Sequence, residues 1–346
     1  MNNHQVRRIL VVFILTACLA LYSAFGQEHQ KLAQSGFQFL SVVSDARAAA
    51  MGEAMTSLEL GSSALFFNPA GMAGMQGLLD ASGSTNQWIA DIKHYTFSVA
   101  ISPFNGDYGV LGFSVQNVHY GDFYGTRVNK ASALGYDDTG IFRLYALAVG
   151  VGYAKELTDR FSVGGHARWI RQNLGRTTIA VNVRTDSTGL VRIADTTRTG
   201  NKLTPFVFDF GTQFKTGVKS LVFGMSVRNF SGEVKYAEEG FQAPLVFTIG
   251  ISMDMMDLIG ELPLEQSLYL SVDASHHRDH PEQVKIGLDY RVMNMVSLRA
   301  GYASSNDEND FSYGLGVSKF GFALDYAYTP FGVFGKVQRL TARFSY

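Results

Sequence analysis

The chain has 346 residues, of which 36 are Gly, 26 Phe and 16 Tyr; 17% are charged and the formal net charge is -1. Soluble domains carry about 25% charged residues, disordered chains combine low hydrophobicity with high net charge, and nucleic-acid binders have a basic excess. The composition therefore excludes disorder and a nucleic-acid partner, and the single Cys excludes a disulfide-stapled or zinc-ribbon domain.

The first 26 residues have the features of a secretory signal peptide. Two cations, Arg7 and Arg8, precede a nearly continuous apolar stretch (9–21), and small residues follow it up to Gly26. We expect cleavage after Gly26. A lipobox that leaves Cys18 as a lipidated N-terminus is the alternative, but the residues after Cys18 stay apolar. In either case the chain leaves the cytoplasm.

Residues 27–77 differ in composition from the rest of the chain. The stretch 41–60 is rich in Ala and Met and predicts a short helix that begins near Ser44 or Asp45. The pair Asn68 and Pro69 ends any helix there, because a residue before proline is pushed toward an extended conformation.

From residue 78 onward the side chains alternate with a period of two. Between Gln283 and Val292, for example, the even positions are apolar and the odd positions are polar or Gly, as on a strand with one apolar face. No stretch after the first 26 residues has the roughly 20 consecutive apolar residues of a membrane helix. We expect fourteen strands, at 78–88, 93–102, 107–119, 141–156, 160–175, 203–214, 218–230, 244–255, 265–275, 282–292, 295–304, 311–318, 320–329 and 337–346.

Two properties of these strands favour a membrane barrel over a secreted β-sandwich, which is the alternative. The polar faces are rich in Gly, Ser and Ala and poor in Lys and Glu, unlike a surface that faces water. The apolar faces tend to begin or end in an aromatic residue, as in the girdle of a barrel at the membrane interface. These aromatic residues are Tyr95, Tyr153, Trp169, Tyr290, Tyr302 and Tyr328.

The connections between the expected strands alternate in length. Those after even strands are mostly tight, whereas three after odd strands are long (120–140, 176–202 and 231–243). Short periplasmic turns and long extracellular loops are typical of bacterial outer-membrane barrels. We expect 176–202 to contain a hairpin that extends an outer loop. The final strand ends on the aromatic Tyr346, as the last strand of an outer-membrane barrel is expected to do.

These patterns predict an all-β protein, a transmembrane antiparallel β-barrel of about fourteen strands in contact with outer-membrane lipid. The expected organisation is a signal peptide (1–26), an N-terminal hatch of helix and loop in the lumen (27–77), and the barrel (78–346). The hatch is expected because a barrel of this size leaves an open lumen unless something fills it. The expected location is the outer membrane of a Gram-negative cell.

The hatch region resembles the N-terminal signature of the PorV/PorQ family, which belongs to the wider group of FadL-like outer-membrane barrels. The resemblance rests on Phe39-Leu40, on the run 45–54 (DARAAAMGEA) and on the run 64–73 (ALFFNPAGMA). Glu53 departs from the family, which usually has a second glycine there. The resemblance implies a component of type IX protein secretion, or an accessory that binds its exported cargo proteins. The alternative within the group is a FadL-like passive channel for long-chain fatty acids or other hydrophobic compounds.

Either function would use the hatch motif to contact a partner or an apolar ligand. The residues that the resemblance places in this motif are Asp45, Arg47, Met51, Gly52, Phe66, Phe67, Asn68, Pro69, Ala70 and Gly71.

Charged residues on the polar faces of the strands form a second candidate group. Both signs are present, which suits a network of paired charges that holds the hatch. The alternative is a lining that selects anionic ligands such as fatty acids. The residues are Arg168, Asp209, Arg228, Asp273, Lys285, Asp289, Arg291, Arg299, Asp325, Arg339 and Arg343.

Catalytic and metal sites find little support. The cluster His276 to His280 falls in a connection with Pro281 behind it, and the acidic run 307–310 lacks the spacing of a calcium loop. No strained Gly-x-Ser-x-Gly turn is present. We therefore expect no enzymatic activity, no metal and no cofactor.

Overall fold

The computed structural model describes residues 35–128, 132–185, 191–236, 239–259, 265–304 and 310–346. The predicted signal peptide, with Cys18, lies outside these residues. Within the described part of the chain, no helix is long and apolar enough to cross a membrane.

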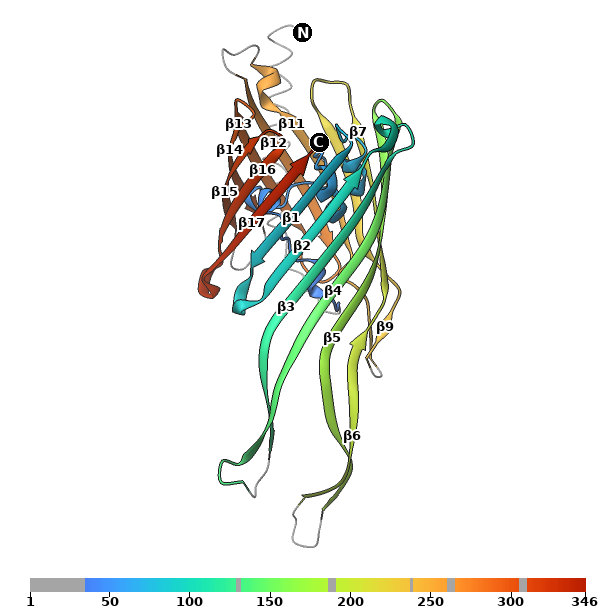
Figure 1. Ribbon diagram of the computed structural model, residues 1–346, viewed down its shortest axis with the longest axis vertical. Helices are drawn as coiled ribbons and strands as arrows, with labels where there is room; N and C mark the ends of the chain where they lie inside the picture. The colour runs from blue at the N-terminus through green and yellow to red at the C-terminus, as the bar shows by residue number, and fades with distance from the viewer. Residues whose placement is uncertain (1–34, 129–131, 186–190, 237–238, 260–264, 305–309) are drawn as a thin grey trace.

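The described strands form a closed antiparallel barrel, which confirms the predicted fold class (Figure 1). The main sheet has 15 strands; β6 extends β5 beyond the barrel, so fourteen strands close it. Pairing of β1 with β17, from Asp80 opposite Ser345 to Gln87 opposite Gln338, closes the ring. The barrel strands are β1 Leu79–Gln87, β2 Lys93–Ile101, β3 Val110–Val128, β4 Tyr136–Thr158, β5 Phe161–Thr185, β7 Phe206–Lys215, β8 Val222–Phe230, β11 Val246–Asp254, β12 Gln266–His277, β13 Gln283–Val292, β14 Val296–Ala303, β15 Phe311–Lys319, β16 Phe322–Pro330 and β17 Lys336–Ser345.

Each expected strand has a counterpart, but one expected loop is mostly strand. The connection 120–140 was expected to be a long loop, whereas β3 runs to Val128 and β4 begins at Tyr136. Register shifts after His119 and Gly125 interrupt the alternation there, which explains why the sequence pattern did not show a strand. The expected hairpin in 176–202 is present as the end of β5 paired with β6 (Val191–Leu203).

The hairpins β3–β4 and β5–β6 project far beyond the barrel at the end where the long connections lie (Figure 1). The C-terminus lies at the opposite end. We call these ends the long-loop end and the short-turn end. A short two-stranded sheet, β9 (Val234–Lys235) with β10 (Gly240–Phe241), lies in the connection between β8 and β11. Short helical turns complete other connections: η4 Ile89–Asp91, η5 Pro103–Gly106, η6 Met255–Leu258 and η7 Gly332–Phe334.

The two faces of the wall differ as the alternation predicts. On β7, the outward Phe206, Phe208 and Phe210 are exposed, whereas the inward Val207 and Asp209 are buried. A barrel buries its inner face only if something fills the lumen.

The filling is the N-terminal segment, drawn in blue inside the barrel in Figure 1. It contains η1 Gln38–Leu40, α2 Ala46–Ala50, η2 Gly61–Phe66 and η3 Pro69–Met72. The helix expected within 41–60 is only the five residues of α2. Asp45 caps it by accepting a hydrogen bond from the Ala48 N–H (2.8 Å), and it ends because Gly52 and Glu53 have left-handed φ values of 61° and 67°.

Candidate functional site

Glycines of the inner wall let the hatch backbone approach closely. A Cβ atom at Gly301 of β14 would overlap the backbone N of Gly52, and one at Gly211 of β7 would overlap the Asn68 side chain. The abundance of Gly on the inner face therefore matches a wall that is shaped around a seated segment.

The Asn68–Pro69 turn is fastened to both the hatch and the wall. Asn68 Nδ2 donates to the carbonyl oxygens of Thr56 (2.7 Å) and Thr212 of β7 (3.0 Å). Its Oδ1 accepts from the Ala70 N–H (3.1 Å) and caps η3. Asn68 is buried, and so are the three residues that follow it. All four motif residues from Asn68 to Gly71 thus lie inside the barrel as a packed turn.

The other motif residues contact other strands of the wall or lie in the hatch core. Met51 and Gly52 pack against β13 and β14, and the Phe66 carbonyl accepts from Arg228 of β8 (2.7 Å). Phe67 is buried in the hatch core. Asp45 and Arg47 join the charged network of the wall.

All eleven of the predicted inner-face charges lie on the lumen side, and one group centres on Asp289 of β13. Its carboxylate accepts from Arg47 Nε (3.2 Å), Arg291 Nη2 (2.8 Å) and Arg299 Nε (3.1 Å). Arg299 also donates to Asp325 of β16 (2.6 Å). This group links the helix α2 to three strands.

The remaining charges hold the hatch at other points. Lys285 pairs with Glu53 (2.7 Å), and Asp273 accepts the backbone N–H groups of Met55 and Thr56 (3.0 Å each). Arg339 donates to the Val43 carbonyl (2.9 Å).

Arg168 and Arg343 complete the set. Arg168 pairs with Asp209 inside the wall (2.7 Å). Arg343 lies 3.6 Å from Asp45 and 3.5 Å from Ser63 Oγ.

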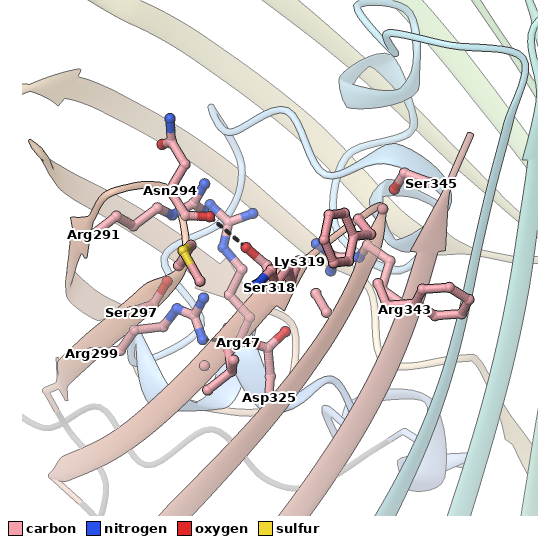
Figure 2. A pocket seen from close by; sticks show the side chains of 17 residues that line it. Arg47, Arg291, Asn294, Ser297, Arg299, Ser318, Lys319, Asp325, Arg343 and Ser345 are labelled. Carbon is pink, nitrogen blue, oxygen red and sulfur yellow. Dashed lines mark hydrogen bonds and ion pairs between the residues drawn. The ribbon is translucent and has the colours of Figure 1, made fainter. Parts of the chain in front are cut away.

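Two cavities lie on either side of α2. One of about 490 Å³ opens at the short-turn end and includes Arg47 and Arg299 in its lining (Figure 2). The other, about 360 Å³, lies at the long-loop end and includes Glu53, Lys285 and Trp88. The segment from Arg47 to Glu53 contributes to both linings, so in this structure the hatch separates the two ends of the lumen on this side.

An apolar recess in the inner wall was not predicted. Inward positions near the long-loop end of β3, β4, β5 and β7 are apolar, although most other inward positions are polar or Gly. The wall residues of this recess are Val118, Ala146, Ala148, Ile170 and Val207. These five break the polar inner pattern, and that break is visible in the sequence.

The recess is filled by the start of the hatch. Phe37, Phe39 and Leu40 are buried in it, and the Phe39 carbonyl accepts from Gln116 of β3 (2.9 Å). Phe241 of β10 covers it, with its ring centroid 5.7 Å from that of Phe37.

A single loop carboxylate fastens this segment. Asp279, between β12 and β13, accepts hydrogen bonds from Ser35 Oγ and from Gln38 Nε2 (2.6 Å). Burial by itself would raise the pKa of Asp279, but these two hydrogen bonds outweigh it and hold the pKa below its usual value. The loop 276–280 therefore acts on the hatch through its Asp.

The His residues of that loop do not converge on a metal. His276 bonds Glu282 (3.0 Å) at the surface, while the His277 and His280 rings lie 5.9 Å apart. No group of three or more metal-ligating side chains occurs among the described residues.

Sequence reasoning also missed a Ser–His–Asp chain across β3, β5 and β7. Ser114 Oγ lies 2.8 Å from His166 Nε2, and His166 Nδ1 lies 3.1 Å from Asp209. All three residues are buried, and none is among the residues that line the two cavities described above. Burial and mutual hydrogen bonding favour a structural role for this chain, which joins β3, β5 and β7.

Comparisons with solved structures support the fold. The toluene transporters TbuX of Ralstonia pickettii (TM-score 0.55, 14% identity, 86% of this chain and 96% of that chain) and TodX of Pseudomonas putida (0.55, 13%, 91% and 98%) are similar. A FadL homologue of Pseudomonas aeruginosa is also similar (0.52, 13%, 88% and 99%). At these identities the likeness shows the fold alone. No family model and no curated protein matches the chain.

Proposed function

We propose that this protein is an outer-membrane channel for hydrophobic small molecules. The observation that carries the proposal is the apolar recess in an otherwise polar lumen wall. Ligand sites are lined mainly by apolar side chains, and an apolar ligand could replace Phe37, Phe39 and Leu40 in this recess. The likeness to proteins named as toluene transporters and a monoaromatic hydrocarbon channel favours the same class of ligand.

Naphthalene tests this proposal because it is neutral, so the lumen charges do not attract it. Purified protein in dodecyl maltoside is titrated with naphthalene, and binding is followed by the ligand's own fluorescence. The variant Val207→Thr combined with Ala148→Ser keeps side-chain size but makes the recess polar. We expect binding to weaken about tenfold, because two apolar contacts are replaced by unpaired hydroxyls.

Val151→Thr on the outward face of β4 is the matched control and should bind as the wild type does. Equal binding by the recess variant and the wild type would refute the assignment of the recess.

Transport would also require the hatch to move, because α2 separates the two cavities. Ser62 of the hatch and Ser98 of β2 have their Oγ atoms 3.0 Å apart, which suits a disulfide after Ser62→Cys and Ser98→Cys. We expect the oxidised form to lose naphthalene uptake into cells and the reduced form to regain it. Thr248→Cys with Ser275→Cys (3.2 Å) joins two wall strands only and should leave uptake unchanged. Full uptake by the oxidised hatch variant would show that the path bypasses the hatch.

The second candidate is a component of type IX secretion, or an accessory that binds its cargo, in which the hatch motif and outer loops contact a protein. The β3–β4 hairpin, which projects beyond the barrel (Figure 1), favours it, because it offers exposed apolar side chains such as Tyr124 and Phe142. A pull-down from detergent-solubilised membranes tests it. Recovery of secretion components or exported proteins, lost when 121–142 is shortened to a tight turn, would support this candidate, and recovery of none would reject it.

A further inference from the structure

The cavity at the short-turn end has a cationic lining (Figure 2). Five of the side chains that line it are cations, which come from five different elements. The lining contains a single side-chain carboxylate, that of Asp325. The cations are Arg47 of α2, Arg291 of β13, Arg299 of β14, Lys319 of β15 and Arg343 of β17.

The carboxylates nearby neutralise only some of these charges. Asp289 and Asp325 form ion pairs with Arg47, Arg291 and Arg299, at N–O distances of 2.6 to 3.2 Å. Three arginines on two carboxylates leave one positive charge in excess.

The other two cations are held loosely. The nearest carboxylate oxygen to Arg343, on Asp45, is 3.6 Å away, and the buried Arg343 Nε has no hydrogen-bond partner among the described residues. Lys319 has only a contact with the ring of Phe320, 4.9 Å from its centroid, in the described part of the chain. Both cations line the cavity, and neither has a carboxylate within 3.5 Å among the described residues.

The rim of the same cavity is apolar. Val317, Phe320 and Phe322, at the turn between β15 and β16, also line it and are strongly exposed. Val317 and Phe322 belong to the outward face of their strands. The cavity thus lies where the cationic lumen meets the apolar outer surface.

We propose that this cavity binds the anionic head group of an amphipathic molecule. The head group bonds Arg343 and Lys319, and the apolar chain runs over Phe320 and Phe322 toward the bilayer. A carboxylate or a phosphate suits these donors, because guanidinium groups bind both through charge-assisted hydrogen bonds. A fatty carboxylate and a phospholipid of the membrane share this chemistry. The site lies at the opposite end of the lumen from the apolar recess, so it goes beyond the proposed channel function and requires no transport.

Calorimetric titration of the full-length barrel in dodecyl maltoside tests the site with three probes. Laurate has the head group and the chain, dodecanol has the chain without the charge, and inorganic phosphate has the charge without the chain. We expect laurate to bind at least tenfold more tightly than either of the others. Equal affinity for dodecanol would refute the role of the cations, and equal affinity for inorganic phosphate would refute the role of the chain.

Two variants locate the binding. We expect Arg343→Gln to weaken laurate binding about tenfold, the usual effect of losing one charge-assisted hydrogen bond. Because Arg343 also contacts the hatch, Lys319→Gln is the second variant, and it should weaken binding several-fold with no effect on the hatch. Lys219→Gln is the matched control, since Lys219 is exposed in a turn at the same end but does not line the cavity. Unchanged laurate affinity in both Arg343→Gln and Lys319→Gln would overturn the proposal.

Competition identifies the source of the head group. Displacement of laurate by low concentrations of dilauroyl phosphatidylglycerol would support the site and assign it to a phospholipid. Preference for laurate would support the site and assign it to a fatty carboxylate. Naphthalene binding at the recess is unaffected by Lys319→Gln if the two sites are separate, so the two proposals can fail independently.

Discussion

Replacement of Asp289 by Asn should release the hatch from the wall. Asp289 is completely buried, and Arg47, its partner on α2, has a side chain only 8% exposed. The substitution keeps the shape of the side chain but leaves the guanidinium of Arg47 without a counter-ion. Asp289 is the one hydrogen-bond and ion-pair partner of the Arg47 side chain in the described part of the chain, so most of the energetic cost falls on Arg47.

The size of the effect depends on whether each arginine still has another partner when Asp289 loses its charge. Arg299 keeps Asp325 (2.6 Å), and Arg291 is 30% exposed and can reach water. Breaking a buried ion pair by removing one partner costs about 3–5 kcal/mol. Arg47 borders the short-turn cavity and can turn toward it, so we expect a free-energy cost of about 3 kcal/mol, at the low end of this range. Because about 1.4 kcal/mol corresponds to a factor of ten, the open state of the hatch should become roughly 100-fold more populated.

Maleimide labelling of a hatch cysteine measures this population. Ser57→Cys is suitable, because Ser57 is buried and its hydroxyl has no hydrogen-bond partner among the described residues. Asp289→Asn should speed labelling roughly 100-fold while the barrel keeps its heat-dependent gel mobility. Asp122→Asn, which breaks the exposed pair with Arg143, is the control and should not change the rate. An unchanged rate in Asp289→Asn would refute the idea that this network holds the hatch.

Two further predictions concern the fit and the charge of the hatch. Gly301→Val should displace the hatch and raise its hydrogen exchange, because the new side chain overlaps the backbone of Gly52. Gly83→Val should not, because the space around its Cβ position is open. Equal hydrogen exchange of the hatch in both variants would contradict this prediction. Burial by itself would raise the pKa of Glu53, but the Lys285 ammonium at 2.7 Å outweighs it and holds that pKa below its usual value. This stabilisation is complete above the unfolded pKa of about 4.3 and is lost as the pH falls through the folded pKa. Acid should therefore raise the hydrogen exchange of the hatch less in Glu53→Gln than in the wild type. An identical rise in both proteins would contradict this prediction.

Glu53 shows how a departure in the sequence can be explained by structure. The resemblance expects glycine at this position, and the left-handed φ of 67° explains why glycine suits it. The glutamate strains the backbone by about 1–2 kcal/mol, and its ion pair with Lys285 offsets part of that cost. The sequence identified the position as unusual, but the partner became visible only when β13 was placed beside the hatch.

The number of strands that close the barrel and their two faces were determined by the sequence itself. Alternation has a period of two on any strand, so a residue such as Asp289 or Arg299 is assigned to the inner face by its neighbours in the chain. In the structure both side chains are buried inside the closed barrel.

Only the tertiary structure decided which inner-face groups meet. Arg47 and Asp289 are 242 residues apart, and no local pattern specifies such a pair. The same holds for the apolar recess, because Phe39 and Val207 come together only when the hatch folds back into the ring. Local periodicity depends on the geometry of neighbouring residues, whereas the lumen contacts depend on how a separate segment fills a closed space, and that is set by shape and charge over the whole ring.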